Sequence, residues 1–144
     1  MTVTEFLRSH VPFLGGLTEE QSRALAVAAT QLSCKKGQTI LFRGITVDGL
    51  HVVAVGKVGV WIKKSKTGPL EMVAALGPGE VFGETSIIEM STAGATVKAE
   101  EDGTLIFVLP QDAFRCILDQ NPEFRARAQA LIAARKPAPP PKPA

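Results

Sequence analysis

FGETSIIEMSTAGATV, residues 82–97, combines two features that suit an anionic ligand. Gly83 opens a segment that reads as a short helix, so free backbone N–H groups and the positive end of the helix dipole would be available there. The Glu84 carboxylate beside these amides can accept hydrogen bonds from hydroxyl groups. A loop and then a strand follow. Together these features predict a pocket for a molecule that carries both a phosphate and a sugar hydroxyl.

The stretch resembles the phosphate-binding cassette of cyclic nucleotide-binding domains, which occur in catabolite-activator-type regulators, kinase regulatory subunits and cyclic-nucleotide-gated channels. The family pattern opens with Phe-Gly-Glu and closes with Arg-(Thr/Ser/Ala)-Ala-(Thr/Ser)-Val. This chain matches both ends of the pattern, at Phe82, Gly83, Glu84, Ala95, Thr96 and Val97. The resemblance covers about residues 5–132, and the run LGPGEVFGE at residues 76–84 is its most specific part. It implies a mainly β fold, an antiparallel β-barrel or jelly roll with N-terminal and C-terminal helices.

Two positions depart from the family pattern. Ala93 stands where the family has the arginine that pairs with the cyclic phosphate, and Gly94 stands where it has a small residue, often with a hydroxyl. A charge-assisted hydrogen bond contributes about 1.5–3 kcal/mol, and a buried charge left unpaired costs about 3–5 kcal/mol. At about 1.4 kcal/mol per tenfold in affinity, cyclic AMP or cyclic GMP should bind roughly a hundredfold to several thousandfold more weakly than in a complete site.

If the pocket is retained, the residues expected to bind the ligand are Phe82, Gly83, Glu84, Thr85, Ser86, Ala93, Gly94, Ala95 and Thr96. Structural roles compete with ligand binding at several of them. Glu84 either accepts a ribose hydroxyl or stabilises a helix start, and a sharp turn alone would require Gly83. The hydroxyls of Thr85 and Ser86 more often satisfy local backbone groups. Lys98 and Arg43 are expected on the surface.

The chain divides into a helical lead-in at 1–30, a β-barrel at 31–110 that contains the cassette-like segment, C-terminal helices at 111–135 and a proline-rich tail at 136–144. In the lead-in, Thr4 is expected to cap a helix, and Thr18 opens a capping box with Gln21. In the barrel, glycines interrupt short runs of Val, Ile and Leu, which is typical of all-β barrels and sandwiches. Gly56 and Lys57 are predicted as a two-residue hairpin turn.

Composition sets further limits. The 144 residues are expected to form one domain, and the net charge of +2 predicts no strong attraction to nucleic acid or membrane. No apolar run reaches the ~18 residues that span a bilayer. Cys34 and Cys116 lack metal or redox spacing, so they are expected to be buried or half-buried thiols in a reducing, cytoplasmic setting. His51 is the single histidine of the barrel segment. No metal cluster, nucleophile motif or Walker loop appears, and catalysis is not expected.

The resemblance implies sensing or scaffolding, and two hypotheses remain. In one, a cyclic mononucleotide or dinucleotide binds the cassette and the C-terminal helices relay the event to a partner protein. In the other, the pocket is degenerate, and the outer face or the terminal helix binds another protein or a second copy of the chain. No cofactor is predicted beyond a candidate cyclic nucleotide. Too few residues follow Pro122 for a long dimer helix and a winged helix-turn-helix, so direct DNA binding is not expected.

The tail, KPAPPPKPA at residues 136–144, has five prolines in nine residues, so it is expected to be extended and solvated. Its PxxP spacing would also suit a polyproline-recognition domain. Deleting these residues should leave the melting temperature nearly unchanged, because the tail cannot contribute to a core. Differential scanning calorimetry of the two chains tests this, and a drop of many degrees would mean that the tail docks on the body.

Overall fold

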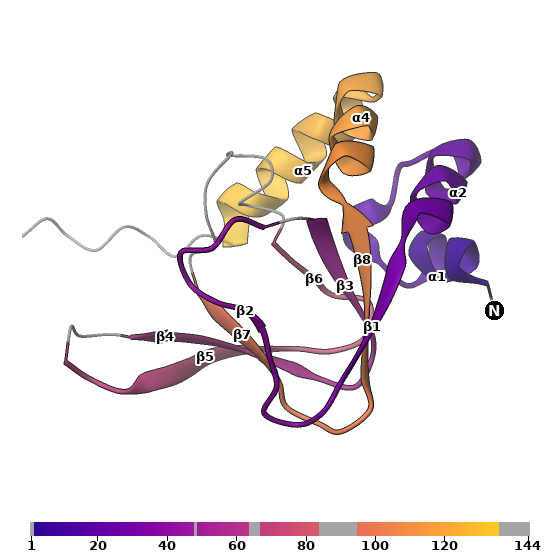
Figure 1. Cartoon of the computed structure of the whole chain (residues 1–144). Coiled ribbons are helices and arrows are strands. Elements are labelled where there is room, and N and C mark those ends of the chain that lie inside the picture. Colours follow the sequence, from indigo (N-terminus) through magenta and orange to yellow (C-terminus); the bar gives the residue numbers. More distant parts are fainter. Residues whose placement is uncertain (1, 48, 64–66, 84–94, 136–144) are drawn as a thin grey trace, which may run out of the picture.

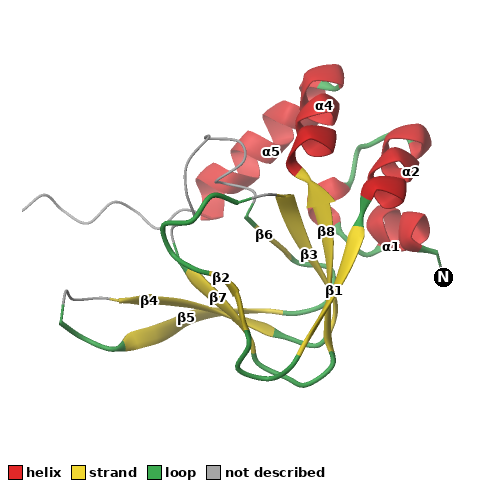
Figure 2. Ribbon diagram, viewed as in Figure 1, coloured by secondary structure: helices red, strands yellow, loops and turns green. Residues whose placement is uncertain are grey.

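A computed structural model describes residues 2–47, 49–63, 67–83 and 95–135. Helices lie at both ends of this part of the chain, and strands lie between them (Figures 1 and 2). The elements are α1 (Val3–Ser9), the 3-10 helix η1 (Pro12–Leu14), α2 (Glu19–Ala28), β1 (Thr30–Cys34), β2 (Thr39–Leu41), β3 (Gly49–Val55), β4 (Val58–Lys63), β5 (Leu70–Leu76), β6 (Val81–Phe82), β7 (Thr96–Ala99), β8 (Thr104–Pro110), α4 (Gln111–Gln120) and α5 (Pro122–Arg135).

The strands of the described residues form two four-stranded sheets. The first sheet has the order β1-β8-β3-β6, and the second has the order β2-β7-β4-β5. Every one of these strand pairs is antiparallel. The prediction of a mainly β, antiparallel jelly roll with flanking helices is therefore confirmed.

The predicted hairpin at Gly56 and Lys57 is wrong. The strands β3 and β4 do follow one another there, but β3 pairs with β6 and β8, whereas β4 pairs with β5 and β7. The turn is therefore a corner between the two sheets. Its conformation is held by distant residues, since the Lys57 carbonyl accepts from Glu100 N at 2.8 Å and Lys57 N donates to Thr104 Oγ1 at 3.5 Å. A glycine-containing turn alone does not distinguish a hairpin from such a corner.

The two faces of the first sheet have different surroundings. Phe107 of β8 meets Phe6 of α1 edge-on, with ring centroids 5.9 Å apart, so this face packs against helices. Val52 of β3 lies opposite Phe107 in register and shares that face. Since successive side chains of a strand alternate, His51 faces the interior between the sheets. Figure 1 shows the helices on the side of the first sheet that points away from the second.

Three phenylalanines from separate elements hold the helical layer together. Phe13 of η1, Phe114 of α4 and Phe124 of α5 are each at most 6% exposed. Their ring centroids lie 6.1–6.2 Å apart, with Phe114 and Phe124 perpendicular and Phe13 nearly parallel to Phe114. Such pairs add to the burial of apolar area. The cluster joins the N-terminal lead-in to both C-terminal helices.

One predicted helix cap is confirmed and the other is wrong. Thr18 Oγ1 accepts from Gln21 N, and Gln21 Oε1 accepts from Thr18 N, both at 3.1 Å. The first helix, however, begins at Val3 and is capped by Thr2 rather than Thr4. Thr2 has an acidic residue three positions later, Glu5, which completes a capping box, whereas the residue three positions after Thr4 is a leucine.

The sheet corner can be tested with a matched pair of glycine substitutions. Gly56 and Gly37 both have φ of +87°. A Cβ at Gly56 would lie 2.6 Å from Thr104 Oγ1 and 2.9 Å from Thr104 Cα, whereas a Cβ at Gly37 has no neighbour within 4 Å. Gly37→Ala should cost about 1–2 kcal/mol from backbone strain alone. Gly56→Ala should cost about 1–3 kcal/mol more because of overpacking. Urea denaturation measures both, and equal losses would contradict a tight corner.

Candidate ligand-binding site

The structure describes four of the nine residues expected to bind the ligand. Phe82 ends β6 and Gly83 follows it, while Ala95 precedes β7 and Thr96 begins it. The other five positions, Glu84, Thr85, Ser86, Ala93 and Gly94, lie outside the described residues. The described part of the candidate site therefore consists of the ends of β6 and β7, where the cassette begins and ends.

Gly83 is required by the fold itself. Its φ is +87°, a left-handed conformation that side chains disfavour. A Cβ at this position would lie 3.1 Å from Val47 Cγ1 and 3.3 Å from the Gly49 carbonyl oxygen. Conformation and space both demand a glycine where the chain leaves β6, whether or not a ligand binds. The cassette thus begins from a tightly packed turn.

His51 supports this turn from the neighbouring strand. It lies opposite Phe82 in register, and the two rings stack with centroids 4.8 Å apart and an angle of 25° between them. His51 is only 5% exposed, and its Nδ1 lies 2.9 Å from the Gly49 carbonyl oxygen. Since a carbonyl can only accept, Nδ1 carries the hydrogen and donates. In the sequence, His51 is an isolated histidine without metal-ligand partners, and its contacts with Gly49 and Phe82 are not predictable from residue order.

Thr96 lies on the outer face of the second sheet. Its neighbour Val97 is buried among the core residues, so the side chain of Thr96 points the other way. Thr96 Oγ1 accepts from Arg43 N at 3.3 Å, and its register partner is Trp61. Among the described residues, the cassette's closing strand therefore contributes this threonine to the outer face rather than to the interior.

Lys98 also lies on that outer face, although it is half-buried instead of fully solvated. Its Nζ is 5.2 Å from the centre of the Trp61 ring, a cation–π distance. The indole Nε1 donates to Glu100 Oε1 at 2.8 Å. Arg43 is exposed, as predicted. These contacts hold Lys98 on the outside of the barrel.

The C-terminal helices are anchored to the N-terminal lead-in. The Arg127 guanidinium of α5 donates to the Gly15 carbonyl at 2.7 Å and to the Pro12 carbonyl at 3.1 Å. Asn121, which precedes α5, donates from Nδ2 to Gln21 Oε1 at 3.2 Å. The last helix is thus fastened to elements that precede the first strand.

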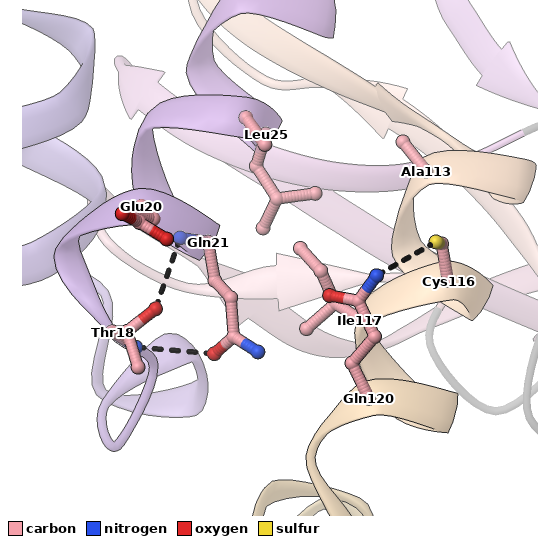
Figure 3. Close-up of a pocket in the computed structure, with 9 residues that line it drawn as sticks. Thr18, Glu20, Gln21, Leu25, Ala113, Cys116, Ile117 and Gln120 are labelled. Carbon is pink, nitrogen blue, oxygen red and sulfur yellow. Dashed lines mark hydrogen bonds between the residues drawn. The ribbon is translucent and has the colours of Figure 1, made fainter.

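A separate groove of about 490 Å³ lies between α2 and α4 (Figure 3). It is outside the barrel, so it is distinct from the expected nucleotide pocket. Its lining is mostly apolar or uncharged, and Glu20 is its one charged residue. The lining residues are Thr18, Glu20, Gln21, Ala24, Leu25, Ala113, Cys116, Ile117 and Gln120.

The two thiols differ from one another. Cys34 is buried at the end of β1, and burial raises the pKa of its thiol, which disfavours the reactive thiolate. Cys116 is exposed in the groove, so the expectation that both thiols are at least half-buried is wrong for this residue. Cys116 Sγ accepts from Gln120 Nε2 at 3.3 Å.

The described residues contain neither a candidate metal cluster nor a helix that could span a membrane. Across the described residues, no group of three or more His, Cys, Asp and Glu side chains has the geometry to hold a metal ion. Within the same part of the chain, no helix is long and apolar enough to cross a membrane.

Comparisons with known proteins agree with the fold. The sequence profile of the cyclic nucleotide-binding domain matches residues 31–121. The chain is 31% identical over 125 residues to the cyclic AMP receptor protein of Thermus thermophilus, a match that covers 86% of this chain and 56% of that protein. The crystal structure of the catabolite activator protein of the same organism, 28% identical, matches with a TM-score of 0.74 over 86% of this chain and 57% of that one.

A regulatory domain of a protein kinase has a similar fold. The regulatory domain of Toxoplasma gondii PKA, solved with cAMP, matches with a TM-score of 0.78 at 20% identity, over 92% of this chain and 48% of that one. The chain therefore spans about half the length of these relatives. From the profile match and the Thermus relative, the chain belongs to the cyclic nucleotide-binding domain family.

The anchor of α5 gives a prediction about stability. Arg127→Ala removes two charge-assisted hydrogen bonds to backbone carbonyls, and because the arginine is exposed we expect a loss of only about 1 kcal/mol. Arg125→Ala is the control, since the Arg125 side chain forms an exposed ion pair with Asp119 at 3.6 Å in the described part of the chain. It should cost less than about 0.5 kcal/mol. Equal urea midpoints for the two variants would contradict the anchoring role of Arg127.

Proposed function

We propose that this domain is a non-enzymatic regulatory or scaffolding module in which binding of cyclic AMP or cyclic GMP is weak or lost. The observation that supports the proposal is Ala93, which the resemblance to the family pattern puts at the position of the phosphate-pairing arginine. The surrounding framework retains the family's fold. In this proposal, the chain differs from the family pattern in the charge of the pocket, whereas the fold that supports the pocket is retained.

The described residues next to Gly83 offer no lysine or arginine in place of a phosphate-pairing arginine. The atoms nearest to the side-chain direction of Gly83 belong to Val47, Gly49 and His51, and none of these is a lysine or arginine. Lys98 is held on the outer face by Trp61. An anionic phosphate transferred from water into this region would lose its hydration without gaining a guanidinium partner.

The output of the module, in this proposal, is contact with another protein. The strand β3, which supports the Gly83 turn, contacts α4, and α5 is fastened to the lead-in through Arg127. A change at the cassette base would therefore shift the C-terminal helices. These helices would present a surface to a partner protein or to a second copy of the chain, in a cytoplasmic setting and without direct contact to DNA.

A functional ligand sensor is the second candidate. The observation in its favour is the intact packing at the start of the cassette, where Gly83 keeps its left-handed conformation against Gly49 and Val47. In this alternative, a cyclic mononucleotide or dinucleotide binds without the arginine, and the same helices relay the event.

Isothermal titration calorimetry with a panel of cyclic mononucleotides and dinucleotides tests the proposal. The unmodified chain should bind cyclic AMP and cyclic GMP weakly or not at all. Ala93→Arg should increase the affinity at least tenfold, because a guanidinium pairs bidentately with a phosphate. Ala93→Lys is the matched control, since it restores the charge without the planar fork and should recover less. Gly94→Thr added to Ala93→Arg should give a smaller further gain.

Three outcomes separate the candidates. Tight binding of cyclic AMP by the unmodified chain would overturn the degenerate pocket and support the sensor. Tight binding of a cyclic dinucleotide alone would also support the sensor. Failure of Ala93→Arg to bind any member of the panel would mean that the pocket is filled or remodelled, and protein interaction would remain as the role.

A further inference from the structure

We propose that the groove between α2 and α4 is the docking site for an amphipathic helix of a partner protein, one that carries lysine or arginine residues beside its apolar side. The inference rests on the proposed function, in which the output of the module is contact with another protein. It adds the surface that makes this contact and the chemistry of the partner. Every residue that lines the groove belongs to the described part of the chain.

The first step is the shape of the groove. Its two sides are helices of 10 residues each, α2 and α4, and each is about 15 Å long at 1.5 Å per residue. Apart from Glu20, the lining residues recur every three or four positions, so they form one face on each helix. Figure 3 shows these two faces turned toward one another. A third helix can lay its side chains into the trough between such a pair.

The second step is the apolar surface that the groove leaves open. Leu25 and Ile117 are buried at its base, whereas Ala24 and Cys116 are exposed and small. A neighbouring depression on α2, of about 470 Å³, shares Ala24 with the groove and includes Val27, whose side chain is 82% exposed. The small side chains leave room for larger apolar side chains of a partner. An exposed apolar surface bounded by polar residues is typical of a protein-interaction site.

The third step is the charge at the two edges of the groove. On α2, Glu20 lines the groove and has no ion-pair partner within the described part of the chain, whereas Arg23 is paired with Glu19 at 3.1 Å. On α4, the exposed Asp112 lies four positions before Cys116, so the two are neighbours on the helix surface. Each helix has two acidic residues and one arginine, and both are therefore net acidic. Lysine or arginine side chains would complement these edges.

A separate partner protein fits this surface better than a second copy of the chain. The basic helix of the chain itself is α5, which has three arginines and one glutamate. Its Phe124 and Ala128 are buried in the core of its own domain, and its Arg127 is bonded to Gly15 and Pro12. The apolar side that α5 would need for docking is thus already used. We therefore assign the groove to a partner.

The test measures the binding of fluorescein-labelled peptides to the full chain by fluorescence anisotropy. The probe is a peptide of about 14 residues, slightly longer than the groove when helical, with leucines every three or four positions and lysines on both sides of them. One control peptide has glutamate in place of each lysine, and another has the same composition in shuffled order. We expect the lysine peptide to bind with a Kd below about 100 μM and the controls at least about tenfold more weakly. No binding of the lysine peptide, or equal binding of either control, would overturn the proposal.

Two matched pairs of variants locate the contact. Ala24→Arg places a bulky cation in the groove and should weaken binding of the lysine peptide at least about tenfold, whereas Ala126→Arg, at an exposed alanine of α5, should change it less than about twofold. Glu20→Lys should weaken binding about fivefold. Glu19→Lys alters the net charge equally in the same first turn of α2, but Glu19 does not line the groove, so the effect should be smaller. Equal losses within either pair would contradict the assignment.

Cys116 provides a second readout inside the groove. Its thiol is exposed, whereas Cys34 is buried, so a chromogenic disulfide reagent should react first with Cys116. The lysine peptide should slow this reaction in the unmodified chain and leave it unchanged in Ala24→Arg. A reaction rate that the bound peptide does not alter would show that the peptide binds elsewhere, and the groove would be rejected.

Sedimentation equilibrium tests the competing occupant. A dimer that Ala24→Arg dissociates and Ala126→Arg does not would mean that a second copy fills the groove, which overturns the proposal. A chain whose mass is the same in both variants supports it. None of these measurements uses a nucleotide. Tight binding of cyclic AMP would therefore overturn the degenerate pocket and leave the groove standing, whereas failure of the peptide experiments would reject the groove alone.

Discussion

The packing of Phe13, Phe114 and Phe124 is the interaction on which the arrangement of the helices depends. Each ring comes from a different element, so none of the three helices can bury its phenylalanine alone. Because α4 follows β8 directly, the cluster also fixes the helices relative to the first sheet. The polar contacts of Arg127 and Asn121 lie at the edge of this cluster and give it a defined orientation. The apolar contacts thus supply most of the stability, and the hydrogen bonds at their margin select one geometry.

The strands could be predicted from the sequence because their signals are local. Short apolar runs separated by glycines led to the correct class of fold, and the Thr18 capping box was recognisable from two residues. The assignment of strands to sheets could not be predicted in the same way. A turn such as Gly56-Lys57 has the same local chemistry in a hairpin and in a corner between sheets. The residue that distinguishes them, Thr104, is 47 positions from Lys57 in the sequence.

In the candidate site, too, some residues were recognisable from the local sequence, whereas others depend on contacts between distant segments. The resemblance led to Phe82 and Gly83, and the structure supplies a physical reason for the glycine in its left-handed turn. His51 was not recognisable as a neighbour of Gly83, because the two residues come together only when β3 pairs with β6. The direction of Thr96 was also hidden, since a motif specifies residue types but not the face of the strand on which each one lies. Arg43 and Trp61, from two other segments, occupy the surroundings of Thr96.

The anchor between α5 and the lead-in has a consequence for how the chain folds during its synthesis. Arg127 and Pro12 are 115 positions apart, so the contact forms only after almost all of the described chain has left the ribosome. Until then, Phe13 lacks its partner Phe124 of α5, although α1 and α2 have already emerged. The Phe13 side chain of the lead-in therefore stays without its late partners Phe114 and Phe124 for most of translation, and exposed apolar surface of this kind favours binding by chaperones and aggregation at high expression. Slower translation would lengthen this exposure rather than protect the nascent domain.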